Sequence, residues 1–71
     1  MPKELGVTAT QSVKLQTIAL GKAVEHINNA ERYGRNAKQF GAMDFSVRIE
    51  TLRQQTQNLI TDIESQLPKT Q

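Results

Sequence analysis

His26 and its neighbour Glu25 are the residues whose types could perform acid–base chemistry. Catalysis of that kind, like metal binding, needs several polar groups that converge on one site. The chain has one histidine and no cysteine, and no two carboxylates have a spacing that would make them converge. We therefore expect no catalytic residue, no metal site and no cofactor, and we interpret His26 as a residue beside a helix interface. The sequence favours a protein that is not an enzyme.

The length of the chain limits it to one small domain. A single core in 71 residues rarely supplies more than ~3–5 kcal/mol of net stability, so association is expected to stabilise the protein. The lack of cysteine excludes disulfides and thiolate metal sites. The longest apolar run, Ile18 to Leu20, is too short for a membrane span or a signal peptide. We expect a soluble, cytoplasmic protein.

The charges are nearly balanced along the chain. Residues 1–35 contain five Lys or Arg against three Glu, and residues 36–71 contain four basic against four acidic residues. Neither half forms a basic block, so nucleic acid is disfavoured as a partner. The alternative function is a small nucleic-acid-associated regulator, in which basic residues of the N-terminal half would contact phosphates. Those residues are Lys3, Lys14, Lys22, Arg32 and Arg35.

The strongest periodic signal lies in residues 45–67 and predicts a long amphipathic helix. Apolar residues and one threonine recur every three or four positions, which places them along one face of a helix. This stripe consists of Phe45, Ile49, Leu52, Thr56, Leu59, Ile63 and Leu67. Ile60 widens the stripe, and Arg53 falls on the polar face. A helix with one apolar stripe must bury it, so we predict that Leu52 and Leu59 are core residues.

A second amphipathic helix is predicted over residues 9–33. Its stripe is formed by Val13, Leu20, Ala23, Val24, Ile27 and Ala30. The small alanines would let another helix approach closely. Leu15 and Ile18 lie off the stripe and widen the apolar surface, so they are candidates for contact with a partner.

The ends of this helix are predicted from capping patterns. Thr8 and Gln11 match a capping box at the start. Gly34 is placed to adopt the left-handed conformation after the last turn, so the helix should stop near Tyr33. We expect the helix to continue through Gly21, although glycine costs about 1 kcal/mol relative to alanine in a helix interior.

The connection between the helices allows two interpretations. In the preferred one, the second helix runs from about residue 37 to residue 67, because Asn36 to Gln39 fits a second capping box. In the other, a short turn at 37–40 precedes a helix that starts near residue 42. Tyr33 and Phe40 are expected to close the open end of the pair, since aromatic rings bury large areas.

A very short link makes the two helices antiparallel neighbours. The predicted fold is therefore all-α: an antiparallel helical hairpin of two long helices, completed by oligomerisation or by a partner. Residues 1–7 are predicted to be a flexible lead-in, residues 8–67 the hairpin, and residues 68–71 a tail.

The segment from Gly34 to Phe40, GRNAKQF, resembles the link of the small co-chaperones of type III secretion needle subunits. In that family a glycine-containing turn leads into a helix that opens with a small or proline residue, a polar residue and an aromatic residue, matched here by Ala37, Gln39 and Phe40. Gly41 has no counterpart in that pattern. The resemblance implies a cytoplasmic helical hairpin that pairs with a helical-repeat chaperone and helps to keep an aggregation-prone subunit soluble.

The function expected from these observations is non-enzymatic protein–protein interaction. The hairpin would act as a subunit of a dimer or bundle, or as a co-chaperone that stabilises a partner protein. The candidate interaction and core face comprises Val13, Leu20, Val24, Ile27, Phe45, Ile49, Leu52, Leu59, Ile60 and Ile63. The candidate partner anchors are Leu15, Ile18, Tyr33, Phe40 and Met43.

Overall fold

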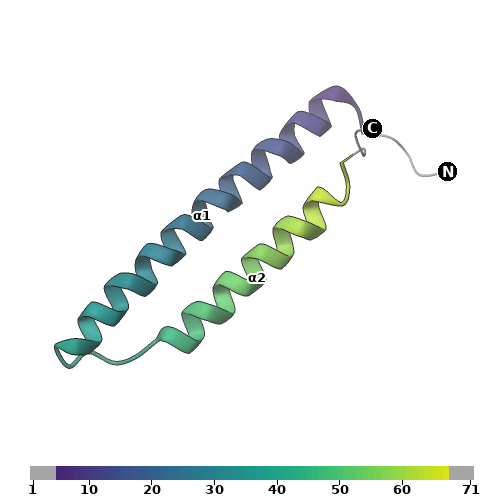
Figure 1. The fold of residues 1–71 in the computed structure, drawn as a ribbon. Coiled ribbons are helices and arrows are strands. Elements are labelled where there is room, and N and C mark those ends of the chain that lie inside the picture. The colour runs from purple at the N-terminus through teal and green to yellow at the C-terminus, as the bar shows by residue number, and fades with distance from the viewer. Residues whose placement is uncertain (1–4, 68–71) are drawn as a thin grey trace.

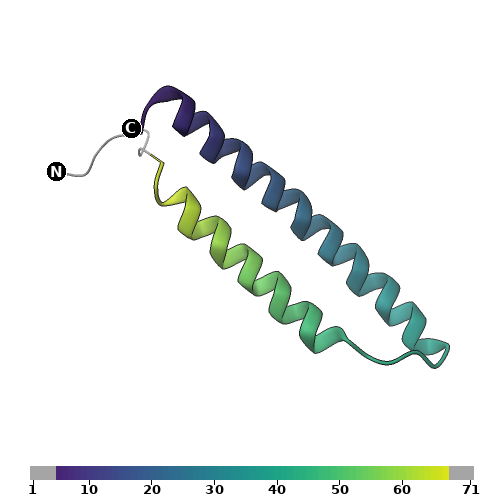
Figure 2. The same cartoon turned by 180° about the vertical axis from the view of Figure 1, so that it is seen from behind.

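Two antiparallel helices form a hairpin in the computed structural model, which describes residues 5–67 (Figures 1 and 2). The first helix, α1, spans Val7–Gln39, and the second, α2, spans Ser46–Glu64. The described residues contain no strand. The predicted all-α antiparallel hairpin is therefore confirmed. Residues 1–4 of the predicted lead-in and the predicted tail, residues 68–71, lie outside the described part of the chain, and Val7 is already helical.

The two helices pack along a seam in which residues recur alternately three and four positions apart. On α1 the seam residues are Thr10, Val13, Thr17, Leu20, Val24, Ile27, Glu31 and Gly34. On α2 and the turn after it they are Ser46, Ile49, Arg53, Thr56, Ile60, Ile63 and Leu67. All are at least partly buried. This seven-residue repeat is the pattern of a coiled coil, in which each seam residue packs between residues of the facing helix.

The seam of α2 is rotated from the predicted stripe. Leu52 and Leu59, predicted to be core residues, remain 51% and 48% exposed, so that prediction is wrong for the hairpin by itself. Arg53, predicted on the polar face, lies in the seam instead, with 18% of its side chain exposed. The rotation places a charge in the seam, where Glu31 of α1 neutralises it. Ile63, with 9% of its surface exposed, is the one buried residue of the described chain.

Helix α1 ends at Gln39, and the glycine that closes it is Gly41 rather than Gly34. The Gly41 N–H donates to Lys38 O at 3.0 Å, and the Ala42 N–H donates to Ala37 O at 3.1 Å. This pair of bonds is a Schellman motif, which requires a left-handed residue, and Gly41 supplies it with φ of 94°. The predicted stop near Tyr33 is wrong because Gly34 is helical and takes part in the seam. A Cβ added at Gly34 would lie 3.9 Å from Ile49 Cδ1, which is ordinary contact.

Both predicted starts of the second helix, near residues 37 and 42, are also wrong. Residues 37–39 belong to α1, and α2 begins at Ser46. The predicted end at Leu67 is three residues too late, because α2 ends at Glu64 and continues into a turn.

At the start of α1 the cap is Gly6, with no side-chain hydrogen bond, so the predicted Thr8 capping box does not form. The helix does continue through Gly21 as predicted.

Asp44 fixes the start of α2. Its Oδ1 accepts a hydrogen bond from the Ser46 backbone N–H at 2.9 Å. Its Oδ2 pairs with Lys38 Nζ at 2.9 Å, which ties the end of α1 to the start of α2. An acidic group is also favoured at a helix N-terminus by the helix dipole. Hydrogen bonds from Lys38 and then from Ser46 hold the pKa of the Asp44 carboxyl well below its usual range.

We expect Asp44→Asn to lower the melting temperature at neutral pH, since the amide can still accept the Ser46 bond but loses the charge that pairs with Lys38. A depressed pKa means that the stabilisation is present above the unfolded-state pKa and is lost as the pH falls through the folded-state pKa. The two proteins should therefore converge as the pH drops well below 3.8. Circular dichroism melts across this pH range measure the difference, and a gap that stays constant into strong acid would contradict this role of Asp44.

Candidate interaction surface

His26 and its neighbour Glu25 are both exposed on α1. No group of three or more His, Cys, Asp or Glu side chains gathers in residues 5–67 to hold a metal. In the same residues, neither helix has a stretch long and apolar enough to cross a membrane. What distinguishes the surface is instead the contrast between the two sides of the seam.

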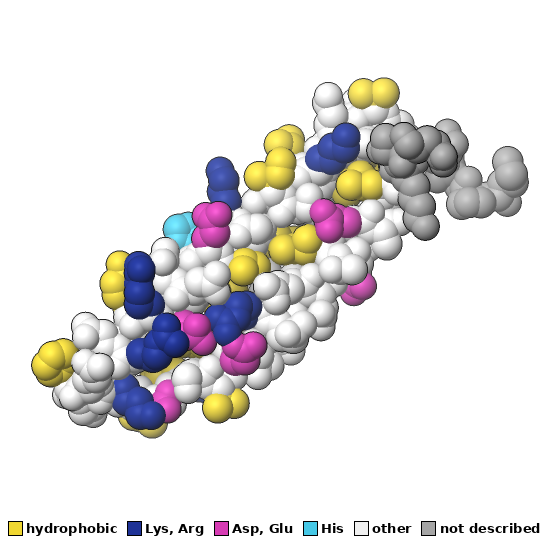
Figure 3. All heavy atoms as spheres, viewed as in Figure 1, with side chains coloured by type: hydrophobic (Ala, Val, Ile, Leu, Met, Phe, Trp, Pro, Cys, Tyr) yellow, Lys and Arg dark blue, Asp and Glu magenta, His cyan; other side chains and the backbone are white. Residues whose placement is uncertain are grey.

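One side of the seam, the polar flank, is built around Arg53. Its Nη1 and Nη2 pair with Glu31 Oε1 and Oε2 at 3.0 and 3.2 Å, which is a bidentate contact. Nη1 also donates to Asn28 Oδ1 at 3.1 Å, and Nη2 pairs with Glu50. Figure 3 shows acidic and basic side chains gathered on this face in the half of the hairpin near the loop. The members of the polar flank are Lys14, Asn28 and Arg35 of α1 and Glu50, Gln57 and Glu64 of α2.

The opposite side of the seam, the apolar flank, carries no charge next to the seam. Asn28 and Glu50, which follow seam residues in their helices, both reach Arg53 and so lie on one side of the pair. The residues that precede every second seam residue, counted from Thr10 on α1 and from Ser46 on α2, must then lie on the other side. On α2 these are Phe45, Leu52 and Leu59, and on α1 they are Ala9, Gln16, Ala23 and Ala30. The large apolar residues of this flank thus come from α2, whereas α1 contributes three alanines and one glutamine.

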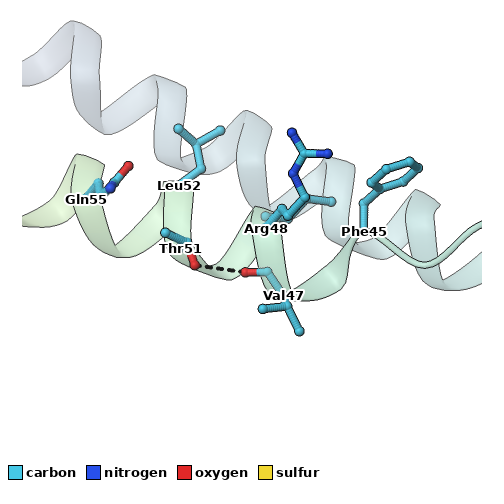
Figure 4. Close-up of a pocket in the computed structure, with 7 residues that line it drawn as sticks. Phe45, Val47, Arg48, Thr51, Leu52 and Gln55 are labelled. Carbon is cyan, nitrogen blue, oxygen red and sulfur yellow. Dashed lines mark hydrogen bonds between the residues drawn. The ribbon is translucent and has the colours of Figure 1, made fainter.

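An open groove runs along this part of α2. It is lined by Phe45, Val47, Arg48, Ile49, Thr51, Leu52 and Gln55. Figure 4 shows Phe45, Arg48 and Leu52 on one side of the helix and Val47 and Thr51 on the other, where Thr51 bonds back to the Val47 carbonyl. The Arg48 guanidinium lies 5.8 Å from the centre of the Phe45 ring, a cation–π distance. The groove is an apolar surface with one basic group at its loop end.

Apart from Phe45, Leu52 and Leu59, the residues of the predicted interaction face lie in the seam. These are Val13, Leu20, Val24, Ile27, Ile49, Ile60 and Ile63. Thr56 lies there too and donates its hydroxyl to Leu52 O at 2.8 Å, so its polar group is satisfied within its own helix. The structure therefore divides the predicted face into an inner seam and an outer flank.

The five candidate anchors fall outside both the seam and the apolar flank. Leu15 and Ile18 are exposed on α1, and Tyr33, Phe40 and Met43 are exposed near the loop. The prediction that Tyr33 and Phe40 close the open end is wrong, since Phe40 is 84% exposed and follows the last turn of α1. The Arg32 guanidinium instead lies over Tyr33, 5.5 Å from the centre of the Tyr33 ring.

The basic residues of the alternative function do not gather into one site. Lys14, Lys22, Arg32 and Arg35 are spread over about six turns of α1, and Glu25 and Glu31 lie among them. Arg32 donates to Asn29 Oδ1 at 3.3 Å. Lys3 lies outside the described residues. A phosphate-binding surface usually needs a denser cluster of basic groups.

Three residues that sequence reasoning did not single out, Arg48, Gln55 and Asp62, are exposed on α2 beside the apolar flank. The signal that could have found them is the spacing of Phe45, Leu52 and Leu59 at seven-residue intervals. A strict repeat of large apolar residues outside the seam marks a second packing face on the same helix.

Comparison with protein-family models, with curated proteins and with solved structures finds no match for this chain. The segment 34–39, in which the resemblance to the needle-subunit co-chaperones placed the link between the helices, is helical in the structure.

Proposed function

We propose that this protein is a non-enzymatic interaction module that binds another protein through its apolar flank. The observation that carries the proposal is that Phe45, Leu52 and Leu59 repeat every seven residues and are each about half exposed. A monomer gains nothing from exposing a regular apolar row, whereas an interface gains about 25 cal/mol for each Å² of apolar surface that it covers.

The weakness of the hairpin's own core supports the same proposal. Ile63 is the one buried side chain of residues 5–67, and most seam positions are only partly covered. A two-helix hairpin with so small a core depends on further burial for stability. Covering the apolar flank would supply that burial on the side where no charged residue adjoins the seam.

The contrast between the flanks gives a matched test of this function. Leu52→Lys places a charge on the apolar flank, and Gln57→Lys places the same charge on the polar flank of the same helix. We expect the wild-type chain and Gln57→Lys to run as assemblies larger than the 8.0 kDa chain, and Leu52→Lys to run as a single chain. Light scattering of the purified proteins, and size-exclusion chromatography of tagged proteins in lysate, give the masses.

Two results would overturn the proposal. One is a wild-type chain that stays at 8.0 kDa both purified and in lysate. The other is a Leu52→Lys chain that assembles as well as Gln57→Lys does, because the apolar flank would then not be the contact.

A further inference from the structure

The exposed face of α2 carries a second row of residues, which we call the outer stripe. It consists of Phe45, Arg48, Leu52, Gln55, Leu59, Asp62 and Gln66. Every member is exposed, and the spacing alternates between three and four residues, as in the seam. This is the pattern of a helix that packs on a second helix of similar length. The outer stripe therefore calls for a long helical occupant rather than a short peptide or a small molecule.

The charges of the outer stripe are self-complementary. Arg48 and Asp62 are its two charged members, and each lies seven residues from Gln55, on opposite sides. Leu52 and Leu59 likewise lie on either side of the middle of the stripe. When the stripe is laid against a copy of itself that runs in the opposite direction, Arg48 of each copy approaches Asp62 of the other. The two leucines of each copy meet the two leucines of the other in the centre.

An antiparallel pairing of this kind already exists within the hairpin. Arg53 of α2 pairs across the seam with Glu31 on the antiparallel α1 and, on its own helix, with Glu50 one turn toward the N-terminus. The Arg48 side chain can likewise extend toward the N-terminus of α2, because long side chains on a helix lean in that direction. The Arg48 guanidinium is exposed and lies over the Phe45 ring, from which it can reach a facing carboxylate.

On the side of the hairpin that carries the outer stripe, the side chains of α1 leave room for a second hairpin. Beside the apolar flank, α1 presents small or uncharged side chains. These include Gln16, Ala19, Ala23, His26, Ala30 and Tyr33. The alanines permit close approach of a facing helix, and no Lys, Arg, Asp or Glu at these positions would meet its own copy.

The overlap of the two copies covers the apolar row. Antiparallel pairing about the middle of the outer stripe overlaps the two copies along the 19 residues of α2, roughly 28 Å of helix. That overlap removes from water the apolar row that the hairpin itself leaves half exposed.

We propose that the occupant of the apolar flank is a second copy of this chain. The two hairpins form a four-helix bundle in which α2 packs antiparallel against α2 of the other copy, across a two-fold axis near the middle of the outer stripe. The interface is isologous: the contact of Arg48 with Asp62 occurs twice. This inference rests on the proposed function, because it names the partner of the same flank.

Charge reversal tests the pairing and its direction. Arg48→Asp alone brings two carboxylates together at each contact, and Asp62→Arg alone brings two guanidinium groups together. We expect each single variant to weaken the dimer about tenfold. An equimolar mixture of the two variants restores opposite charges at both contacts, so mixed dimers should form within about threefold of the wild-type affinity. The variant Glu64→Arg makes a similar charge change on the polar flank and should leave the dimer unchanged.

Sedimentation equilibrium of the purified chains, with one variant of each mixture carrying a dye, measures these affinities. The inference is overturned if the purified wild-type chain stays at 8.0 kDa at all concentrations, or if the mixture is no tighter than the single variants. It is also overturned if the single variants pair as well as the wild type, since Arg48 would not face Asp62. A wild-type chain that is monomeric when pure, but enters a complex in lysate that Leu52→Lys abolishes, would contradict self-pairing and leave the proposed function standing.

Discussion

Replacing Ile63 by alanine is expected to leave the chain largely unfolded at room temperature. Ile63 is the most deeply buried residue of the described chain, with 9% of its surface exposed. Truncating a buried isoleucine removes its transfer free energy and leaves a cavity, at a cost of about 2–5 kcal/mol. That cost rivals the ~3–5 kcal/mol that a core of this size supplies.

The matched control for this substitution is Ile18→Ala. Ile18 lies in the middle of α1 and is more than half exposed, so the same change should alter the free energy of unfolding by less than about 0.5 kcal/mol. Circular dichroism melts at matched concentration compare the two. If both variants melt like the wild type, Ile63 does not hold the seam together.

The second large effect is expected at the ion pair within the seam. Arg53→Leu leaves the Glu31 carboxylate in the seam without its basic partner. We expect this to cost about 1–3 kcal/mol, less than for a fully buried pair because about a fifth of each side chain is exposed. Replacing both residues, Arg53→Leu with Glu31→Leu, should restore the wild-type free energy of unfolding or exceed it by about 1 kcal/mol, because no charge is then desolvated.

Denaturant titration of the two single variants and the double variant forms a double-mutant cycle. A double variant whose loss equals the sum of the single losses would show that Arg53 and Glu31 act independently, contrary to the geometry. We also expect the double variant to lose uniqueness of register, because a polar residue in a coiled-coil seam specifies which residues face each other. Broadened amide signals in its NMR spectrum would reveal that loss.

The sequence predicted the hairpin but not which face of α2 packs on α1. The difference concerns three places in α2 where either of two adjacent residues could occupy the seam. The predicted stripe and the true seam share Ile49, Thr56, Ile63 and Leu67. They differ where Phe45, Leu52 and Leu59 compete with Ser46, Arg53 and Ile60. Hydrophobicity alone selects the first set. The second set is selected by the facing helix, because Glu31 interrupts the apolar seam of α1 and demands a basic partner.

The end of α1 was mispredicted because two glycines compete for it. Gly34 and Gly41 can both adopt the left-handed conformation, but the residues after Gly34 form helix readily, and Gly34 also lies at a seam position where a small residue suits the contact with Ile49. Local capping rules take no account of the seam or of which residues face each other across it. Three of the ten residues of the predicted face, Phe45, Leu52 and Leu59, belong to the apolar flank, but only the three-dimensional pairing shows that these three stay exposed.

The concentration dependence of the wild-type melt tests most directly the claim that the apolar flank is an interface between copies of this chain. A dimer is stabilised by mass action, so its melting temperature must rise with protein concentration. We predict a clear rise over a roughly hundredfold range of concentration, and a much smaller rise for Leu52→Lys. A cooperative melt at the same temperature throughout that range, with a mass of 8.0 kDa, would contradict the account.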